Sequence, residues 1–183
     1  MKLLNMLNEE EFLTEGKSDT SKGCLMLVFK NINNWNNIIG IIKESDIYND
    51  ETDDYGLENK PHATVIYGIN STIKHDKIRK FINENVKEPL KITLTGISVF
   101  ENDKYDVVKF NVESPDLKAL HALVKDNFDN ELTFKDYIPH VTIGYVHKGR
   151  GKDYIFNLKN KIEIKSNEFN YSIGSSDFIE FKI

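Results

Sequence analysis

The sequence lacks the features of disulfide-bonded, membrane-spanning and zinc-binding proteins. Cys24 is the only cysteine among 183 residues, so it cannot form a disulfide within the chain, and its apolar neighbours indicate a small buried side chain in a reducing compartment. No run of about 18 apolar residues is present, and the N-terminal segment turns acidic at Glu9, so we expect neither a membrane helix nor a secretory signal. No group of cysteines and histidines has zinc-finger spacing. We therefore expect a cytoplasmic protein with no metal and no cofactor.

A strong positive charge is also missing. The formal net charge is −5, whereas proteins that bind long nucleic acids usually present a basic face. We expect a small nucleotide as partner, held by a local patch, and neither long nucleic acid nor membrane. With 183 residues and 39% hydrophobic side chains the chain can form one domain. We place this domain at residues 23–183, preceded by a polar N-terminal arm at residues 1–22, and we expect a monomer.

One heptapeptide pattern occurs twice. The segment Pro61–Tyr67 reads PHATVIY and the segment Pro139–Tyr145 reads PHVTIGY, with proline, histidine, threonine and tyrosine at identical positions. Three of the five histidines lie elsewhere, so composition alone does not produce this match. The repeat indicates two half-domains, each of which contributes one strand to a shared cleft.

The spacing within each copy has a chemical meaning. Residues i and i+2 of a strand point to the same face, so His62 projects beside Thr64 and His140 beside Thr142. Histidine titrates near neutral pH, so one imidazole can act as a base while the other acts as an acid. Each threonine can hydrogen-bond a phosphate oxygen. We therefore predict that these four residues are catalytic and leave open which histidine is the acid.

A structural role is the alternative for each copy. A single His-x-Thr strand is more often structural than catalytic, and the second copy with the same flanking residues favours an active site. Tyr67 and Tyr145 lie an odd number of residues after their histidines, so in a regular strand they would face the core. A bulge or a strand end would return them to the cleft, where we expect them to bind substrate.

Further candidates for substrate binding lie outside the repeat. Lys148 and Arg150 belong to a glycine-rich basic stretch, in which turned backbone N–H groups and positive charges could hold an anion, although a plain surface turn fits equally well. Trp35, the only tryptophan, could stack on a base, although core packing is its commoner role. Phe29 and Phe134 are further stacking candidates. We interpret the acidic segment 45–60 as a solvated loop or as a lid over the cleft.

Hydrophobic patterning predicts an α+β fold with mainly antiparallel sheets and outer helices. The elements alternate along the chain, and the tail contains two or three short strands. Strands are expected at 24–29, 62–67, 90–100 with a bulge at Gly96, 105–112, 140–145, 162–164, 169–173 and 178–183, and helices at 35–42, 74–86 and 114–128. His121 is expected to be a packed, structural histidine on the last helix.

The two His-x-Thr motifs, each preceded by a proline, resemble the 2H phosphoesterase superfamily, which includes RNA ligase-like proteins and cyclic phosphodiesterases. The similarity extends from about Gly23 to the C-terminus and includes the segments 56–58, 107–110 and 137–143. It implies a bilobal α+β protein of two mainly antiparallel sheets with outer helices, pseudo-two-fold symmetric around a central cleft. The sequence is most similar to phage-encoded members of the anti-CBASS nuclease kind, which cut cyclic nucleotide signals of bacterial immunity.

These features predict a metal-independent phosphodiesterase, a hydrolase that cleaves a small cyclic nucleotide or oligonucleotide. In a phage it would act in the host cytoplasm and serve immune evasion by degrading an immune signal. The alternatives are a 2',3'-cyclic nucleotide or 2'-5' RNA phosphodiesterase, a non-catalytic protein that sequesters a cyclic nucleotide, and a virion or host-takeover interaction protein. RNA ligation is not expected, because no nucleotidyl-transfer lysine motif is present.

Overall fold

The computed structural model describes residues 22–30, 32, 34–50, 55–132, 136–174 and 177–183. Most of the predicted N-terminal arm and Phe134 lie outside the described residues. The strands are β1 (Lys22–Val28), β2 (His62–Asn70), β3 (Leu90–Glu101), β4 (Tyr105–Glu113), β5 (His140–His147), β6 (Phe156–Ser166), β7 (Glu168–Ile173) and β8 (Asp177–Lys182). The helices are α1 (Trp35–Ile39), α2 (His75–Asn85) and α3 (Pro115–Asn127), with short 3-10 helices η2 (Glu44–Asp46) and η3 (Gly151–Tyr154).

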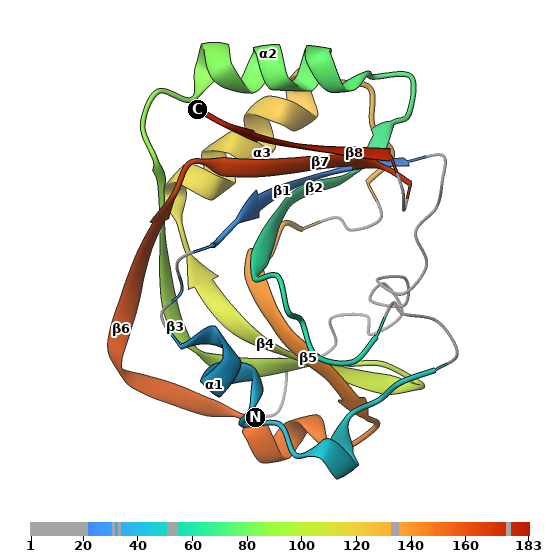
Figure 1. Cartoon of the computed structure of the whole chain (residues 1–183), viewed down its shortest axis with the longest axis vertical. Coiled ribbons are helices and arrows are strands. Elements are labelled where there is room, and N and C mark those ends of the chain that lie inside the picture. The colour runs from blue at the N-terminus through green and yellow to red at the C-terminus, as the bar shows by residue number, and fades with distance from the viewer. Residues whose placement is uncertain (1–21, 31, 33, 51–54, 133–135, 175–176) are drawn as a thin grey trace, which may run out of the picture.

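The strands form two four-stranded antiparallel sheets, which confirms the predicted α+β architecture (Figure 1). Sheet A has the order β2-β1-β7-β8, and sheet B has the order β5-β4-β3-β6. The long strand β6 pairs with β3 in sheet B and leads directly into β7 of sheet A, so it joins the two sheets. In each sheet the strand that carries a His-x-Thr motif is the outermost strand of the ladder.

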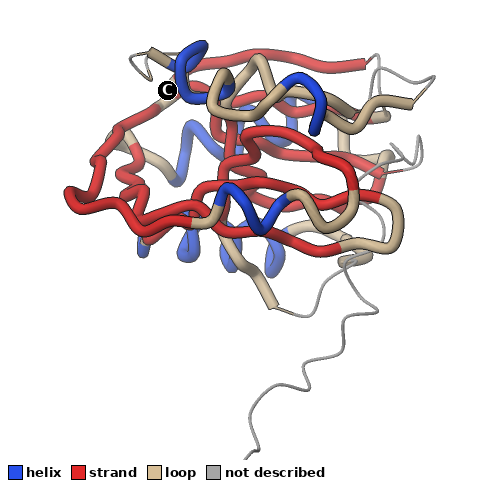
Figure 2. The backbone as a smooth tube through the Cα atoms, turned by 90° about the horizontal axis from the view of Figure 1, so that it is seen from below, coloured by secondary structure: helices blue, strands red, loops and turns tan. Residues whose placement is uncertain are grey.

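Sheet A has one buried face and one partly open face. Leu25 and Leu27 of β1 are fully buried, whereas the residues between and beside them are half-buried. Cys24 belongs to this half-buried set, so its predicted burial was wrong. Helices α2 and α3 contact the strands of this sheet and cover its apolar face (Figures 1 and 2). His62 and Thr64 are half-buried residues of β2, so they lie on the open face, which we call the motif face of sheet A.

The boundaries of the helices follow their capping residues. Helix α3 begins at Pro115, and the Ser114 hydroxyl accepts a hydrogen bond of 3.0 Å from the backbone N–H of Leu117, as N-caps do. Helix α1 is shorter than predicted: Asn34 has a left-handed φ of 63° and makes no side-chain cap, and the helix ends before Gly40. None of the described helices is long and apolar enough to cross a membrane.

Irregular segments pair with the outer edges of both motif strands. Along β2, the N–H of Glu131 donates to the carbonyl of Gly68 at 2.8 Å. Along β5, the N–H of Tyr48 donates to the carbonyl of Tyr145 at 2.9 Å, and the N–H of Tyr145 donates to the carbonyl of Gly56 at 2.8 Å. The described ends of the acidic segment 45–60 are therefore bound to β5 rather than being a solvated loop. These contacts protect the outer edges of both motif strands from pairing with other chains.

Gly68 is required by this pairing. Its φ is +107°, and a Cβ atom there would overlap the Glu131 carbonyl oxygen. We predict that Gly68→Ala lowers the free energy of unfolding by about 2–4 kcal/mol, because left-handed strain adds to a backbone overlap. Gly149→Ala is the matched control, because Gly149 has a φ of +82° with nothing within 4 Å of an added Cβ. It should cost about 1–2 kcal/mol in urea unfolding, and equal losses in the two variants would contradict the role of the overlap.

Candidate active site

The two motif strands contact one another where the sheets meet. His62 and His140 are the first residues of β2 and β5, and Figure 1 shows these strands crossing the middle of the molecule. The hydroxyl of Tyr137, just before the second motif, donates a 2.7 Å hydrogen bond to the carbonyl of Thr64 in the first motif. The segment that enters the second motif is therefore bound to the first one.

Both motif histidines are held in the same way. The Nδ1 atom of His62 lies 2.9 Å from the carbonyl oxygen of Lys60, and the Nδ1 atom of His140 lies 2.9 Å from that of Ile138. A carbonyl only accepts, so Nδ1 carries the proton in each ring. In the neutral ring Nε2 is then a base, and in the charged ring Nε2–H is an acid. Both side chains are half-buried, so a ligand can reach them.

Strand pairing places each threonine beside its histidine. On β1, Val28 is opposite His62 and Met26 is opposite Thr64. On β4, Asn111 is opposite His140 and Lys109 is opposite Thr142. Cross-strand partners point to the same face of a sheet. Val28 and Met26 therefore lie on the motif face of sheet A. Asn111 and Lys109 lie on the face of sheet B that carries His140 and Thr142, which we call the motif face of sheet B.

A β-bulge occurs at the same place in both motif strands. The pairing of β2 with β1 skips Val65, and the pairing of β5 with β4 skips Ile143. Each bulge shifts the alternation by one residue, so Tyr67 falls on the same face as Thr64, and Tyr145 on the same face as Thr142. Both tyrosines are half-buried there. The sequence places the two tyrosines on this face only if a bulge or a strand end interrupts each strand, and both strands have such a bulge.

Two stacking candidates are buried in the core. Trp35 is 7% exposed, and its indole N–H donates a 2.7 Å hydrogen bond to the carbonyl of Glu58, shortly before the first motif. Phe29 is 2% exposed. Neither ring has an open face for a base, so the structure contradicts the stacking interpretation and assigns both residues to packing. Trp35 positions the segment that leads to His62.

The basic stretch after the second motif is bound to acidic side chains of the protein. Arg150 Nε donates to Asp46 Oδ1 at 3.0 Å, and Lys148 Nζ lies 3.7 Å from Asp103 Oδ1. The pKa of the Asp46 carboxyl is held below its usual value, first by the hydrogen bond from Tyr154 and then by that from Arg150. Substrate binding by Lys148 and Arg150 stays a prediction, and it would compete with these ion pairs.

The backbone of this turn does not form the anion site that the glycines suggested. The N–H groups of Gly149 and Gly151 donate to the same carboxylate oxygen, Oδ2 of Asp106, at 2.8 and 2.9 Å. Asp106 is 1% exposed, so it takes the place expected for a substrate anion. The turn is thus held by the protein's own carboxylate.

Tyr137 and His121 together support the backbone of the first motif. His121 Nδ1 lies 2.7 Å from the carbonyl of Val65, and its ring stacks on that of Tyr137 with 4.0 Å between centroids. The two side chains bind the carbonyls of Thr64 and Val65, which lie at the bulge of β2. The packed role predicted for His121 is confirmed, whereas no sequence pattern indicated a role for Tyr137.

A second polar cluster lies beside the other motif. Lys109 is only 3% exposed, and its ammonium donates to Ser98 Oγ at 2.9 Å and to Asn111 Oδ1 at 3.0 Å. The ammonium also lies over the Phe100 ring, 4.1 Å from its centroid, and this ring is 5.0 Å from that of His140. Sequence patterning placed Lys109 in a strand and provided no reason to expect a buried cation.

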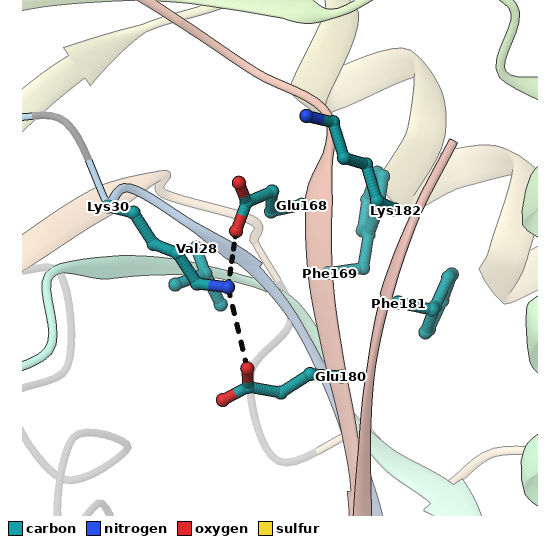
Figure 3. Close-up of a pocket in the computed structure, with 7 residues that line it drawn as sticks. All are labelled: Val28, Lys30, Glu168, Phe169, Glu180, Phe181 and Lys182. Carbon is teal, nitrogen blue, oxygen red and sulfur yellow. Dashed lines mark ion pairs between the residues drawn. The ribbon is translucent and has the colours of Figure 1, made fainter.

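A pocket of about 340 Å³ lies beside the ends of β1, β7 and β8 (Figure 3). Lys30 bridges two carboxylates in it, with its Nζ at 2.6 Å from Glu168 and 3.5 Å from Glu180. The hydrogen bond with Glu168 is the main reason why the pKa of Lys30 is raised. Val28, opposite His62, also lines this pocket, so the pocket borders the motif face of sheet A.

Among the described residues, no group of three or more His, Cys, Asp or Glu side chains could hold a metal ion.

Removal of the Tyr137 hydroxyl tests how the first motif is anchored. Tyr137→Phe leaves the Thr64 carbonyl without this hydrogen bond, so we expect a loss of about 1–3 kcal/mol in the free energy of unfolding. Tyr48→Phe is the control, because the Tyr48 hydroxyl has no hydrogen bond among the described residues. It should change stability by no more than about 0.5 kcal/mol. Equal stabilities of Tyr137→Phe and wild type in urea unfolding would contradict this anchor.

The pKa of His121 is lowered from its usual 6.5, mainly by burial, while the hydrogen bond with the Val65 carbonyl acts in the opposite direction. Below about pH 6.5 the unfolded chain binds a proton that the folded protein does not, so stability should fall as the pH drops below this value. His121→Gln has no titrating group. The difference in the free energy of unfolding between pH 7.5 and 5.5 should therefore be smaller in the variant, and an unchanged difference would contradict this assignment.

A curated relative and a family model match this chain. The family model described as the 2'-5' RNA ligase superfamily matches residues 38–158, a span that contains both motif strands. An RNA 2',3'-cyclic phosphodiesterase of Methanothermobacter thermautotrophicus is 28% identical over 127 residues. This match covers 64% of the chain and 64% of the relative's own length, so the chain spans just under two thirds of that relative.

Solved structures share the fold at low identity. Usb1 of Kluyveromyces marxianus superposes with a TM-score of 0.61 at 13% identity, over 90% of this chain and 99% of that one. The same protein with uridine monophosphate gives a TM-score of 0.58 at 14% identity, with the same coverage. The protein TT0787 of Thermus thermophilus gives 0.51 at 11% identity, over 87% of this chain and 94% of that one. These similarities establish the fold.

The family assignment rests on the span that the model matches. It covers more than half of the chain, and it includes the two His-x-Thr strands, the bulges and the polar cluster around Lys109. The resemblance inferred from the repeated motif is thereby confirmed at the level of the superfamily. The chain belongs to the 2'-5' RNA ligase superfamily.

Proposed function

We propose that this protein is a phosphodiesterase in which His62 and His140 act on one phosphorus atom from opposite sides. The observation that carries this proposal is the identical anchoring of the two rings, each through Nδ1 to a carbonyl two residues earlier, on strands that contact one another. This anchoring makes Nε2 the nitrogen of each ring that can exchange a proton with a ligand. A purely structural histidine pair would not need the same orientation of both rings.

The reaction is a proton-coupled displacement at phosphorus. One Nε2 takes a proton from the attacking oxygen, which belongs to water or to a ribose 2'-hydroxyl. That oxygen forms a new bond to phosphorus while the bond from phosphorus to the leaving oxygen breaks. The other Nε2–H gives its proton to the leaving oxygen. Thr64 and Thr142 donate hydrogen bonds to the non-bridging oxygens, where negative charge increases. With water as the attacking group, a cyclic phosphodiester becomes a phosphomonoester and a free hydroxyl.

The substrate class is a small nucleotide with a cyclic or 3'-terminal phosphodiester. The curated relative supports a 2',3'-cyclic phosphate, and the Usb1 structure with uridine monophosphate supports a nucleotide. Tyr67 and Tyr145 project from the same faces as the threonines and can contact the nucleoside. The negative net charge fits a short ligand better than a long nucleic acid.

A narrower form of this proposal concerns cyclic nucleotide signals of bacterial immunity. The same two histidines would cleave such a signal, and the protein would then be a phage enzyme of the anti-CBASS kind. A non-catalytic sponge for the same nucleotides is the alternative. Product formation distinguishes a 2',3'-cyclic phosphodiesterase, an anti-CBASS enzyme and a sponge. The sponge binds a nucleotide without forming product, and the two enzymes form product from different substrates.

The direct test is turnover against a panel of substrates in the presence of a chelator. The panel contains 2',3'-cyclic nucleotides, 2'-5' linked RNAs and cyclic di- and oligonucleotides, with products resolved by chromatography. Each of His62→Ala and His140→Ala should lower kcat by about 10²–10⁴, the usual contribution of an acid or base. Both variants should keep the wild-type circular dichroism spectrum.

His75→Ala is the matched control for these variants. His75 is the first residue of α2, and its Nε2 lies 3.3 Å from the carbonyl of Asp177, away from the motif strands. This variant should retain wild-type turnover. Normal turnover by either motif variant would contradict the proposal, and loss of all turnover on adding the chelator would contradict its metal-independent form.

A further inference from the structure

The two motifs differ in the residues that lie opposite them. On sheet A the partners of His62 and Thr64 are Val28 and Met26, which are apolar. On sheet B the partners of His140 and Thr142 are Asn111 and Lys109. The likeness of the two motif strands therefore does not extend to the neighbouring strands, because only β4 carries an amide and an ammonium group at these places.

The orientation of the Asn111 amide follows from its neighbours. The Lys109 ammonium can only donate, so the Asn111 atom that lies 3.0 Å from it must be the oxygen Oδ1. Ser98 Oγ donates to the same oxygen at 2.6 Å. With both lone pairs of Oδ1 engaged, the amide cannot be flipped. Among the described residues no group accepts a hydrogen bond from Nδ2, and the half-buried side chain shares its face with His140.

The positive charge of the Lys109 ammonium beside Oδ1 makes the Nδ2–H groups of Asn111 stronger hydrogen-bond donors. Lys109 is 3% exposed, and an ammonium is costly to remove from water unless its hydrogen bonds are satisfied. A positive charge on the oxygen side polarises the amide, and chains of hydrogen bonds in a low dielectric strengthen one another. The Phe100 ring contacts both the ammonium and the His140 ring, which keeps Lys109 in place.

We propose that Asn111 Nδ2 donates a hydrogen bond to a non-bridging oxygen of the scissile phosphate, next to His140. Lys109 and Ser98 are positioning residues that hold the amide in this orientation. This inference rests on the proposed function and deepens it, because it makes the two sides of the site unequal. The sheet B side then offers the phosphate one donor more than the sheet A side, where the corresponding residues Val28 and Met26 are apolar.

The alternative is that the cluster only stabilises sheet B, and stability measurements separate the two. Removing a buried charge also removes the cost of burying it, and the Ser98 hydroxyl still donates to Asn111 Oδ1 in such a variant. Lys109→Met introduces the residue that the other half carries at the equivalent place, Met26. The variant should therefore keep or raise its melting temperature while its kcat falls by about tenfold or more, as expected when a transition-state donor is weakened.

The decisive variant is Asn111→Asp, which keeps the shape of the side chain and removes both N–H donors. It should lower kcat by about 10²–10³, as the loss of one transition-state donor does, with a smaller change in KM. Asn85→Asp on α2 is the matched control, because it makes the same chemical change on an exposed helix surface, and it should retain wild-type kinetics. Ser98→Ala should give an intermediate loss.

The outcomes separate this inference from the proposed function. If wild type turns over, His62→Ala does not, and Asn111→Asp keeps activity within about threefold, the inference is overturned and the function stands. If wild type turns over no substrate, the proposed function is wrong. The site is then tested by the rise in the melting temperature of the protein when uridine monophosphate is added. A rise in wild type that is absent in Asn111→Asp supports the donor, and equal rises overturn it.

Should Asn111→Asp fail to fold, Lys109→Met decides between the outcomes. Wild-type activity of this variant overturns the inference, and a reduced kcat with an unchanged melting temperature supports it.

Discussion

The hydrogen bond between each motif histidine and the carbonyl two residues before it determines what the site can do. Lys60 and Ile138 provide these carbonyls, and a proline lies between each carbonyl and its histidine. Proline restricts its own φ and favours an extended residue before it, so the backbone turns each carbonyl toward the ring that follows. The proton is thereby kept on Nδ1, and Nε2 becomes the nitrogen that can gain or lose one. The repeated proline is thus explained by the orientation of the rings.

The two halves of the protein share features of the backbone and differ in the side chains beside the motifs. Each motif strand has a bulge one residue after its threonine, and each is paired along its outer edge by an irregular segment. These devices place a tyrosine on each motif face. The side chains on the adjoining strands are unequal, with apolar residues on β1 and the Lys109 cluster on β4. A duplicated scaffold can therefore hold an asymmetric ligand in one orientation.

The sequence predicted the strands that have many buried aliphatic residues, and it failed where most side chains of a strand are exposed. β1, β2 and β5 were placed correctly because their aliphatic residues are buried, and the bulge at Gly96 was foreseen from the glycine. β6 was recognised only at residues 162–164, because most of its side chains are exposed and show no apolar period. The hydrogen bonds between the basic turn and Asp106 could not be foreseen, because this carboxylate is distant in sequence. Tyr137 and Asn111 could not be identified, since their roles depend on contacts between strands that no local pattern encodes.

The central claim is that the Nε2 atoms of His62 and His140 meet the same phosphate while both Nδ1 atoms remain bound to the backbone. Nitrogen-15 NMR of the imidazole rings, recorded while uridine monophosphate is added, tests this directly. The account predicts that the Nε2 signals of both rings shift together at one ligand concentration, while both Nδ1 signals stay those of protonated nitrogen. A shift confined to one ring, or movement of the proton from Nδ1 to Nε2 in either ring, would contradict it.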